Sequence, residues 1–479
     1  MNPLAEQNLL LTRRHFFSRF GLGLGTAALA SLLGEHGFAN PDEDKPGLPG
    51  VPHFAPKAKR VIYLFQSGAP SHLDLFDPKP VLTQRTGQEL PDSIRKGQRI
   101  TGMTSGQDKL LLVGPAHKFV PQGKARTLIS EMLPHTGQIM DELCLVRSMY
   151  TEPINHDPAV TFLLTGNQQP GRPTVGAWVA YGLGSVNKNL PEYVVLLSGG
   201  GGQPLQTRYW GNGFLPGKYQ GVQFRSGGDP VLYVQNPQGM DAQTRRDILD
   251  GVQALNRLQL DAIGDPDIAT RINSYEMAFK MQTSVPELMD LSKEPAKVLE
   301  MYGAEPGKAS YANNCLLARR LAERGVRYIQ LYHRDWDHHG NLPSEIKRQC
   351  ETTDRASAAL VRDLKQRGML DDTLVIWGGE FGRTAYSQGK ISPGNFGRDH
   401  HPRCFSIWMA GGGIKGGLCH GQTDDFGYNL VDGGIHVHDF QATILHLLGV
   451  DHTKLVFRHQ GRDYRLTDIS GRVASELLA

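Results

Sequence analysis

The stretch "TTDRASAALVRDLKQRGMLDDTLVIWGGEFG", residues 352–382, decides the fold class. Its first half places apolar side chains on one face of a helix, at Ala356, Ala359, Leu360 and Leu364. Gly368 is a natural helix end, and residues 373–382 open with a continuous apolar run of strand length. Strands that are apolar on both faces are typical of parallel sheets covered by helices. A helix followed by such a strand predicts an α/β fold.

The same alternation extends over most of the chain. Further strands are predicted at 60–66, 143–150, 192–201, 326–333 and 405–413. Helical patterns precede or follow them at 125–142, 175–184, 312–325 and 438–449. Strands alternating with helices favour a three-layer α/β sandwich with a mostly parallel central sheet and right-handed crossovers. Residues 58–479 are therefore predicted to form one α/β domain.

Residues 203–310 interrupt this alternation. Their first part, up to about residue 235, is rich in glycine and aromatic residues, and polar helices follow it. We interpret the segment as a loop-rich insertion beside the site. Its aromatic side chains would suit stacking on a carbohydrate, and they would suit loop packing equally well.

The N-terminus predicts export. Residues 1–39 contain Arg13-Arg14, Phe16-Phe17 and a Gly/Ala/Leu run that is too short for a comfortable membrane span. The arginine pair resembles a twin-arginine (Tat) export signal, which implies the Tat machinery as a partner and a periplasmic or extracellular location. An N-terminal membrane anchor is the alternative, although no stable span is expected in the mature chain. Residues 40–57 are rich in proline and are predicted to be a linker.

Composition narrows the possible functions further. The net charge is only +3 and no basic run is interleaved with aromatic residues, so nucleic acid is not an expected partner. The cysteines are odd in number, scattered and without a CxxC pair, which argues against a disulfide framework: Cys144, Cys315, Cys350, Cys404 and Cys419. Because Tat carries folded proteins, such a chain could keep its thiols and acquire a metal before export.

Polar side chains follow nearly every predicted strand. The richest group is "RDWDHHGN", residues 334–341. Other groups contain His72, Asp74 and Asp77; Asn155, His156 and Asp157; Glu380 and Arg383; Arg398, Asp399, His400 and His401; and His436, His438 and Asp439. In open α/β sheets, active residues lie beyond the carboxyl ends of the strands. Mixed Asp, Glu and His side chains suit zinc, manganese and similar divalent ions.

Strand geometry limits which of these residues can act together. If the strand before "RDWDHHGN" continues, one of His338 and His339 points away, and Asp337 and His339 share a face with Asp335. On a helix, Asp335 and His339 would pair instead. The adjacent residues His400 and His401 are not both expected in one site.

Three stretches resemble the alkaline phosphatase-like superfamily, which includes the sulfatases. They are "DDTLVIWGGEFG" (371–382), "HDPAVTFLLTG" (156–166) and "HDFQATILHLLGVD" (438–451). In this resemblance Glu380 stands where the superfamily has a metal-binding Asp, and His156 stands in the nucleophile's place. The chain resembles more closely a poorly characterised Tat-exported family within it, through "GAPSHLDLFDPKP" (68–80), "WDHH" (336–339), "GEFGRT" (379–384) and "GRDHHP" (397–402).

The resemblance implies a metal-dependent hydrolase of phosphate or sulfate esters acting on a small-molecule or carbohydrate ester. It favours Asp337 and His339 over Asp335 and His338. The predicted ligands of a divalent metal ion (zinc, calcium or manganese) are Asp337, His339, Glu380 and His401, with Asp74 as a further candidate. Arg383 is predicted to clamp the anion. His156 is predicted to be a ligand or general acid/base, and a nucleophilic His156 is the second mechanism.

Departures from the superfamily leave other functions open. Sulfatases begin their first strand loop with an Asp pair, where this chain has Gln66 and Ser67. The Cys or Ser nucleophile is absent, so formylglycine chemistry is not expected. A metal- or ligand-binding protein without catalysis is therefore the main alternative, and a phosphomutase-like transferase is the third.

Overall fold

The computed structural model describes residues 47–187, 189–226, 231, 239–263, 266–392 and 394–479. The predicted export signal and residues 40–46 of the predicted linker lie outside the described residues. Within the described part of the chain, no helix combines the length and the apolar character needed to cross a membrane. The five cysteines all lie in described segments and are free thiols.

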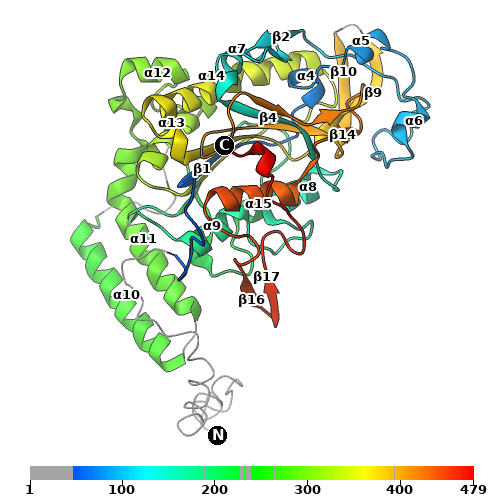
Figure 1. Ribbon diagram of the computed structural model, residues 1–479. Coiled ribbons are helices and arrows are strands. Elements are labelled where there is room, and N and C mark those ends of the chain that lie inside the picture. The colour runs from blue at the N-terminus through cyan, green and yellow to red at the C-terminus, as the bar shows by residue number, and fades with distance from the viewer. Residues whose placement is uncertain (1–46, 188, 227–230, 232–238, 264–265, 393) are drawn as a thin grey trace. The chain divides into compact units, whose positions relative to one another are not determined.

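A nine-stranded sheet forms the centre of the fold (Figure 1). Its order is β12 (Leu418–His420), β4 (Leu143–Tyr150), β11 (Phe405–Ala410), β8 (Thr373–Gly378), β1 (Arg60–Gln66), β7 (Tyr328–His333), β5 (Tyr193–Ser198) and β6 (Val222–Phe224), with β15 (Ile435–His436) also paired to β4. All six predicted strands are among them. The sheet is mostly parallel, and β11 runs antiparallel to both of its neighbours. The start of β11 therefore lies at the edge where the parallel strands end.

Helices cover both faces of the sheet, as Figure 1 shows. Ile62 and Leu64 of β1 pack in one core with α13 (Tyr311–Glu323) and α14 (Leu342–Gln366). The alternate residues Tyr63 and Phe65 pack in a second core with α8 (His156–Thr165), α9 (Val175–Leu183) and α15 (Val437–Leu447). Successive side chains of a strand point to opposite faces, so both faces are buried. The predicted three-layer α/β sandwich is confirmed.

One helix prediction was wrong. Residues 125–142 form β3 (Thr127–Ser130), which pairs with β2 (Phe119–Gln122), and then the single turn α7 (Pro134–Gly137). Pro134 is compatible with the first turn of a helix but not with its interior, so it divides the segment. The helix predicted at 352–368 instead begins ten residues earlier, at Leu342.

Residues 203–310, which were predicted to be an insertion, contain a helical hairpin, α10 (Ala242–Ile263) and α11 (Pro266–Met289), followed by α12 (Ala296–Tyr302). In the part before α10, Tyr209 and Trp210 are buried. Phe214 stacks on Phe457 of β16 (Phe457–His459), which pairs with β17 (Arg462–Tyr464). These aromatic rings therefore take part in loop packing.

Shorter elements complete the described chain: α4 (His72–Leu75), α5 (Pro80–Gln84), α6 (Asp92–Arg95), β9 (Gly382–Ser392), β10 (Asn395–His401), β13 (Gln422–Thr423) and β14 (Leu430–Asp432). The β9–β10 hairpin lies between β8 and β11 in the sequence.

Candidate metal centre

Four polar side chains meet at the carboxyl edge of the sheet. Asp337 and His339 lie in the loop after β7. His156 is the first residue of α8, after β4, and His400 lies in β10, just before β11. Because β11 is antiparallel, the segment that precedes it reaches the same edge as the loops that follow the parallel strands.

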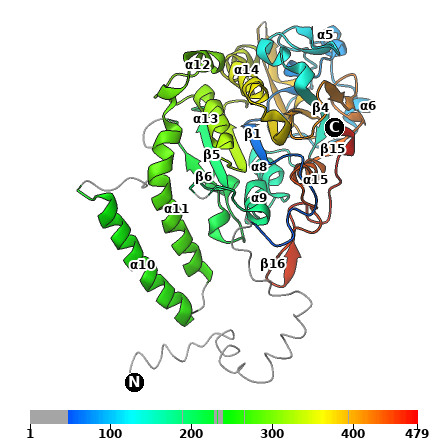
Figure 2. The ribbon, with the colours of Figure 1, turned by 60° about the vertical axis from the view of Figure 1, so that its left-hand side comes forward.

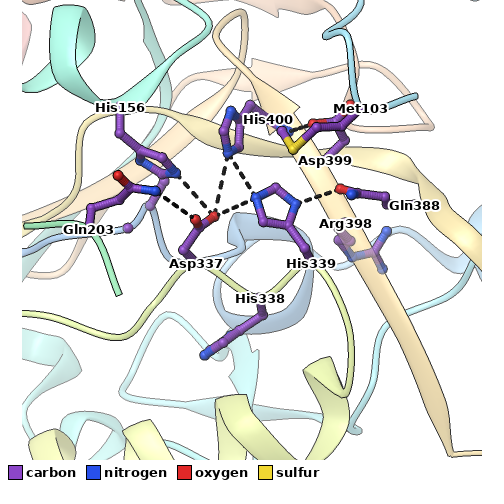
Figure 3. Close-up of polar contacts among 12 residues, drawn as sticks. Met103, His156, Gln203, Asp337, His338, His339, Gln388, Arg398, Asp399 and His400 are labelled. Atoms are coloured by element: carbon purple, nitrogen blue, oxygen red, sulfur yellow. Dashed lines mark hydrogen bonds and ion pairs between the residues drawn. The ribbon is translucent and has the colours of Figure 1, made fainter. Parts of the chain in front are cut away.

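The carboxylate of Asp337 lies between three imidazole rings (Figure 3). Its Oδ1 atom is 3.0 Å from Nε2 of His156, 2.8 Å from Nε2 of His339 and 3.4 Å from Nε2 of His400. The Nε2 atoms of His339 and His400 are 3.1 Å apart. One ligand atom from each of the four residues lies within 4.8 Å of every other. The four donors therefore converge on one point.

The other ring nitrogen of each histidine faces a hydrogen-bond acceptor. Nδ1 of His156 is 2.5 Å from Oε1 of Glu380, and Nδ1 of His339 is 2.5 Å from Oε1 of Gln388. Nδ1 of His400 is 2.8 Å from the Ile154 carbonyl oxygen. Each Nδ1 therefore carries the hydrogen, and in the neutral ring the lone pair lies on Nε2. Metal-binding histidines are commonly oriented in this way.

The surroundings of the centre shift the pKa values of its side chains. Burial alone would raise the pKa of Asp337, but the Arg383 guanidinium, 2.6 Å from Oδ1, and the adjacent histidine rings hold it far below its ordinary value. Burial, with the Arg383 charge, lowers the pKa of His400 to about 4, so its ring is neutral at pH 7. Burial also acts to lower the pKa of His156, but its bonds to Asp337 and Glu380 outweigh burial and raise it.

The donor set fits a divalent transition metal. Zinc–nitrogen bonds of about 2.0–2.1 Å in a tetrahedron separate ligand atoms by about 3.3–3.4 Å. The separations among the ligand atoms of Asp337, His339 and His400 are 2.8, 3.1 and 3.4 Å. Three imidazoles and one carboxylate suit zinc and neighbouring transition metals, whereas calcium prefers oxygen ligands. The chemistry therefore favours zinc or manganese over calcium.

Buried contacts hold the loop after β7 in place. Trp336 is fully buried, and its Nε1 donates to Oε1 of Gln66 at 2.9 Å. A Cβ atom at Gly397 would lie 1.9 Å from the His339 carbonyl oxygen, so β10 can approach the loop this closely only with glycine there. This contact brings His400 beside His339.

His338 turns away from the centre, as Figure 3 shows. Its Nε2 donates to the Asp335 carbonyl oxygen at 2.9 Å, and burial lowers its pKa to about 4. A continuing strand predicted that one of His338 and His339 points away, and the family resemblance favoured His339 for the site. The structure reaches this arrangement differently, because β7 ends at His333 and a loop follows. Asp335, with φ of 81°, also lies outside the group of four.

Two predicted ligands lie elsewhere. Asp74 is fully buried and pairs with Arg398, with 2.7 Å between Oδ2 and Nε. Nε2 of His401 donates to the Tyr428 carbonyl oxygen at 2.7 Å, and the two rings stack. Neighbouring residues of a strand point to opposite sides, so only His400 of the pair faces Asp337.

Glu380 is the third predicted ligand outside the group of four, and it lies beside the centre together with Arg383. Oε1 of Glu380 contacts the far nitrogen of His156 and accepts from the Gly68 N–H at 3.1 Å. Arg383 donates to the carbonyl oxygens of Gly68, Ala69 and Arg398 as well as to Asp337. The guanidinium is thus an ion-pair partner of Asp337 rather than an open anion clamp.

Three contributors were not identified from the sequence: His400, Gln388 and the Ile154 carbonyl. The adjacent histidines at 400 and 401 indicated that one of them could enter the site, but strand alternation did not show which one. Gln388 and Ile154 are far in sequence from the histidines that they contact, and neither lies in a distinctive motif. No sequence signal therefore pointed to them.

Solved structures that align with this chain have low sequence identity to it. A sulfatase of Pseudoalteromonas sp., PsFucS1, aligns with a TM-score of 0.37 at 12% identity over 95% of this chain and 75% of its own. The lipoteichoic acid synthase LtaP of Listeria monocytogenes aligns with a TM-score of 0.32 at 7% identity over 86% and 75%. Alkaline phosphatase from the Antarctic bacterium TAB5 aligns with a TM-score of 0.29 at 10% identity over 82% and 98%.

Sequence comparison gives the family. A search of curated protein sequences found no significant match. Residues 58–478 match the family model described as "Protein of unknown function (DUF1501)", a span that covers the whole sandwich and the centre at its edge. The chain is therefore a member of the DUF1501 family.

Proposed function

We propose that this protein is a metal-dependent hydrolase of phosphate or sulfate esters. In this proposal Asp337, His339 and His400 hold the metal, and His156 transfers protons. The observation that carries it is the convergence of three Nε2 atoms on Oδ1 of Asp337, with each Nδ1 bonded to an acceptor.

His156 differs from the other two histidines in its partner. Nδ1 of His339 and of His400 faces a neutral oxygen, whereas Nδ1 of His156 faces the Glu380 carboxylate. A carboxylate stabilises an imidazolium, so His156 is the ring best placed to gain a proton. Two histidines and one carboxylate leave coordination positions open for water and an ester oxygen. Four protein ligands would fill a tetrahedral site.

The residues of the chain have separate tasks in hydrolysis. The bound metal supplies Lewis acidity toward the ester oxygen and lowers the pKa of a water molecule. Water attacks phosphorus or sulfur, and the bond to the leaving oxygen breaks. His156 donates the proton on Nε2 to that oxygen and regains one from the attacking water. Glu380 accepts from Nδ1 throughout and holds the ring in place.

We also propose where in the cell the protein acts. We infer export by the Tat machinery to the periplasm or the outside of the cell, from the arginine pair at residues 13–14 and the run that follows it. The proposed substrate is accordingly an ester present outside the cytoplasm.

Metal content and hydrolysis together test the proposed function. We expect the purified protein to contain about one zinc or manganese ion per chain and to hydrolyse aryl sulfates or aryl phosphates. Removal of the metal by a chelator should abolish turnover, and its return should restore it. Protein without stoichiometric metal would refute the metal centre. Metal without hydrolysis of any ester in the panel would instead support the non-catalytic binding protein.

Substrate charge should affect the rate. The donor groups of Arg383 and Arg398 are directed at carbonyl oxygens and at Asp337 and Asp74, so neither guanidinium is available for a second anionic oxygen. We expect monoanionic esters, such as an aryl sulfate or a phosphodiester, to exceed a dianionic aryl phosphate in kcat/KM by about tenfold, which corresponds to about 1.4 kcal/mol. A comparison of esters that have the same leaving group isolates the effect of substrate charge on kcat/KM. A preference for the dianion would contradict this expectation.

A further inference from the structure

The loop after β5 packs directly on the loop that carries part of the metal centre. Strand β5 pairs with β7 and lies beside β6 at one side of the sheet (Figure 2). The Arg334 N–H donates to the Ser198 carbonyl oxygen at 3.2 Å, and the Arg334 guanidinium donates to the Gly199 carbonyl oxygen at 2.8 Å. A Cβ atom at Gly199 would lie 2.8 Å from the Arg334 nitrogen, so the close approach depends on glycine. Residues 199–203 are thus held beside the loop after β7.

Gln203 reaches the metal centre from this segment. Its Nε2 donates to Oδ2 of Asp337 at 3.4 Å, as Figure 3 shows. The Gln203 side chain is exposed, and this separation exceeds the usual 2.7–3.2 Å of an N–H···O bond, so the contact is weak. The side chains of Asp337 and His339 are 13% and 25% exposed, whereas that of His156 is 6% exposed. Gln203 therefore contacts the centre on its solvent-facing side.

The amide of Gln203 has a donor to spare. A side-chain amide carries two N–H groups, and within the described part of the chain the acceptor that Gln203 meets is Asp337. The other amide at the centre is that of Gln388, which lies on the far side of the His339 ring and accepts from its Nδ1 (Figure 3). Gln203 is therefore the amide that can donate to a molecule bound at the solvent-facing side.

The cationic side chains around the centre already have partners. Arg383 and Arg398 direct their donor groups at carbonyl oxygens and carboxylates of the chain. Arg208, on the same segment as Gln203, pairs with Asp157. An amide gives an anionic oxygen a hydrogen bond, but it brings no positive charge to balance a second anionic oxygen. A donor of this kind suits an ester group with a single negative charge.

We propose that the free N–H of Gln203 binds a non-bridging oxygen of the ester and selects monoanionic esters, the class of sulfate monoesters and phosphodiesters, over dianionic ones. The inference rests on the proposed function and adds to it the residue that recognises the charge of the substrate. The second N–H stays on Oδ2 of Asp337. One side chain then contacts both the ester and a metal-binding carboxylate, which fixes the ester group relative to the centre.

Loss of the amide tests the contact. Gln203→Met keeps the length of the side chain and removes both donors. We expect kcat/KM to fall by about 10- to 100-fold for an aryl sulfate and for a phosphodiester with the same leaving group, the range for a hydrogen bond to a charged oxygen. Because Gln203 is exposed, metal content and thermal stability should stay at wild-type values. Gln206→Met, at an exposed glutamine of the same segment, is the matched control and should keep wild-type activity.

A cation in place of the amide tests selection by charge. In Gln203→Lys, the ratio of kcat/KM for a dianionic aryl phosphate to that for the aryl sulfate should rise at least about tenfold, because an ammonium group attracts a second negative charge. A residue that only orients Asp337 would change both rates equally. Wild-type kcat/KM in Gln203→Met, or an unchanged ratio in metal-containing Gln203→Lys, would overturn the proposal. If Gln203→Lys loses the metal, the result with Gln203→Met decides.

Binding of non-hydrolysable analogues separates this inference from the proposed function. In calorimetric titrations at mildly alkaline pH, the wild type should bind benzenesulfonate, a monoanion, more tightly than phenylphosphonate, a dianion. Gln203→Met should weaken the binding of benzenesulfonate by at least about tenfold. Such binding without hydrolysis of any ester would refute the hydrolase and keep the role of Gln203. Hydrolysis that is unchanged in Gln203→Met would do the reverse, and a protein that neither binds the analogues nor hydrolyses esters would overturn both.

Discussion

Replacement of Asp337 by asparagine is expected to remove the bound metal and the activity together. Oδ1 of Asp337 is the point on which the three Nε2 atoms converge, and this oxygen carries the only carboxylate charge of the four donors. An amide oxygen in its place supplies no charge to the cation. We expect kcat/KM to fall by at least about 10³-fold, equivalent to about 4 kcal/mol, and metal to fall well below one ion per chain.

Asp337 also neutralises a buried cation, so this variant needs a companion. Arg383 is 1% exposed, and loss of the partner of a buried pair costs about 3–5 kcal/mol of stability. His339→Gln avoids this cost, because the His339 side chain is 25% exposed and does not pair with Arg383. It should lose metal while the chain remains folded.

His338→Gln is the matched control, since the neighbouring ring points away and contacts the Asp335 carbonyl. It should retain the metal and the activity. If both His339→Gln and Asp337→Asn kept a full complement of metal, the centre would be refuted. Elemental analysis with circular dichroism on the same samples separates loss of metal from loss of fold.

His156→Gln is expected to keep the metal and lose turnover. If His156 moves the proton rather than holding the ion, three ligands remain and kcat falls by about 10²–10⁴-fold. The loss should depend on the leaving group. A nitrophenolate needs little protonation and should be affected least, whereas a phenolate or alkoxide should be affected most.

The same variant can contradict the assignment in two ways. Loss of metal in His156→Gln would make His156 a fourth ligand, and an equal loss for all leaving groups would remove its role as acid. Glu380→Gln is the partner control, because it keeps an acceptor for Nδ1 but removes the charge that stabilises the imidazolium. It should reproduce the leaving-group pattern at smaller amplitude, with metal content unchanged.

The local pattern of apolar residues was enough to predict the strands of the central sheet. Each predicted apolar run became a strand of the sheet, because a run that is apolar on both faces can be buried only between two layers. The prediction failed at 125–142, where apolar spacing suited a helix but Pro134 and pairing with β2 favoured a strand and a turn. Pairing with a remote strand is a tertiary property that local spacing does not contain.

The sequence by itself predicted the α/β sandwich and the edge on which the site lies, and its candidate residues included Asp337, His339 and His156 of the group of four. Only the tertiary structure decided between His400 and His401. A bulge between Arg398 and His400 in the β9–β10 hairpin sets which of the two faces Asp337, and the close contact at Gly397 sets how near it comes. The tertiary structure also moved Asp74 into a buried pair with Arg398, and Glu380 behind His156. Residue type limits which atoms can bind a metal, but the point on which they converge depends on contacts between segments far apart in the chain.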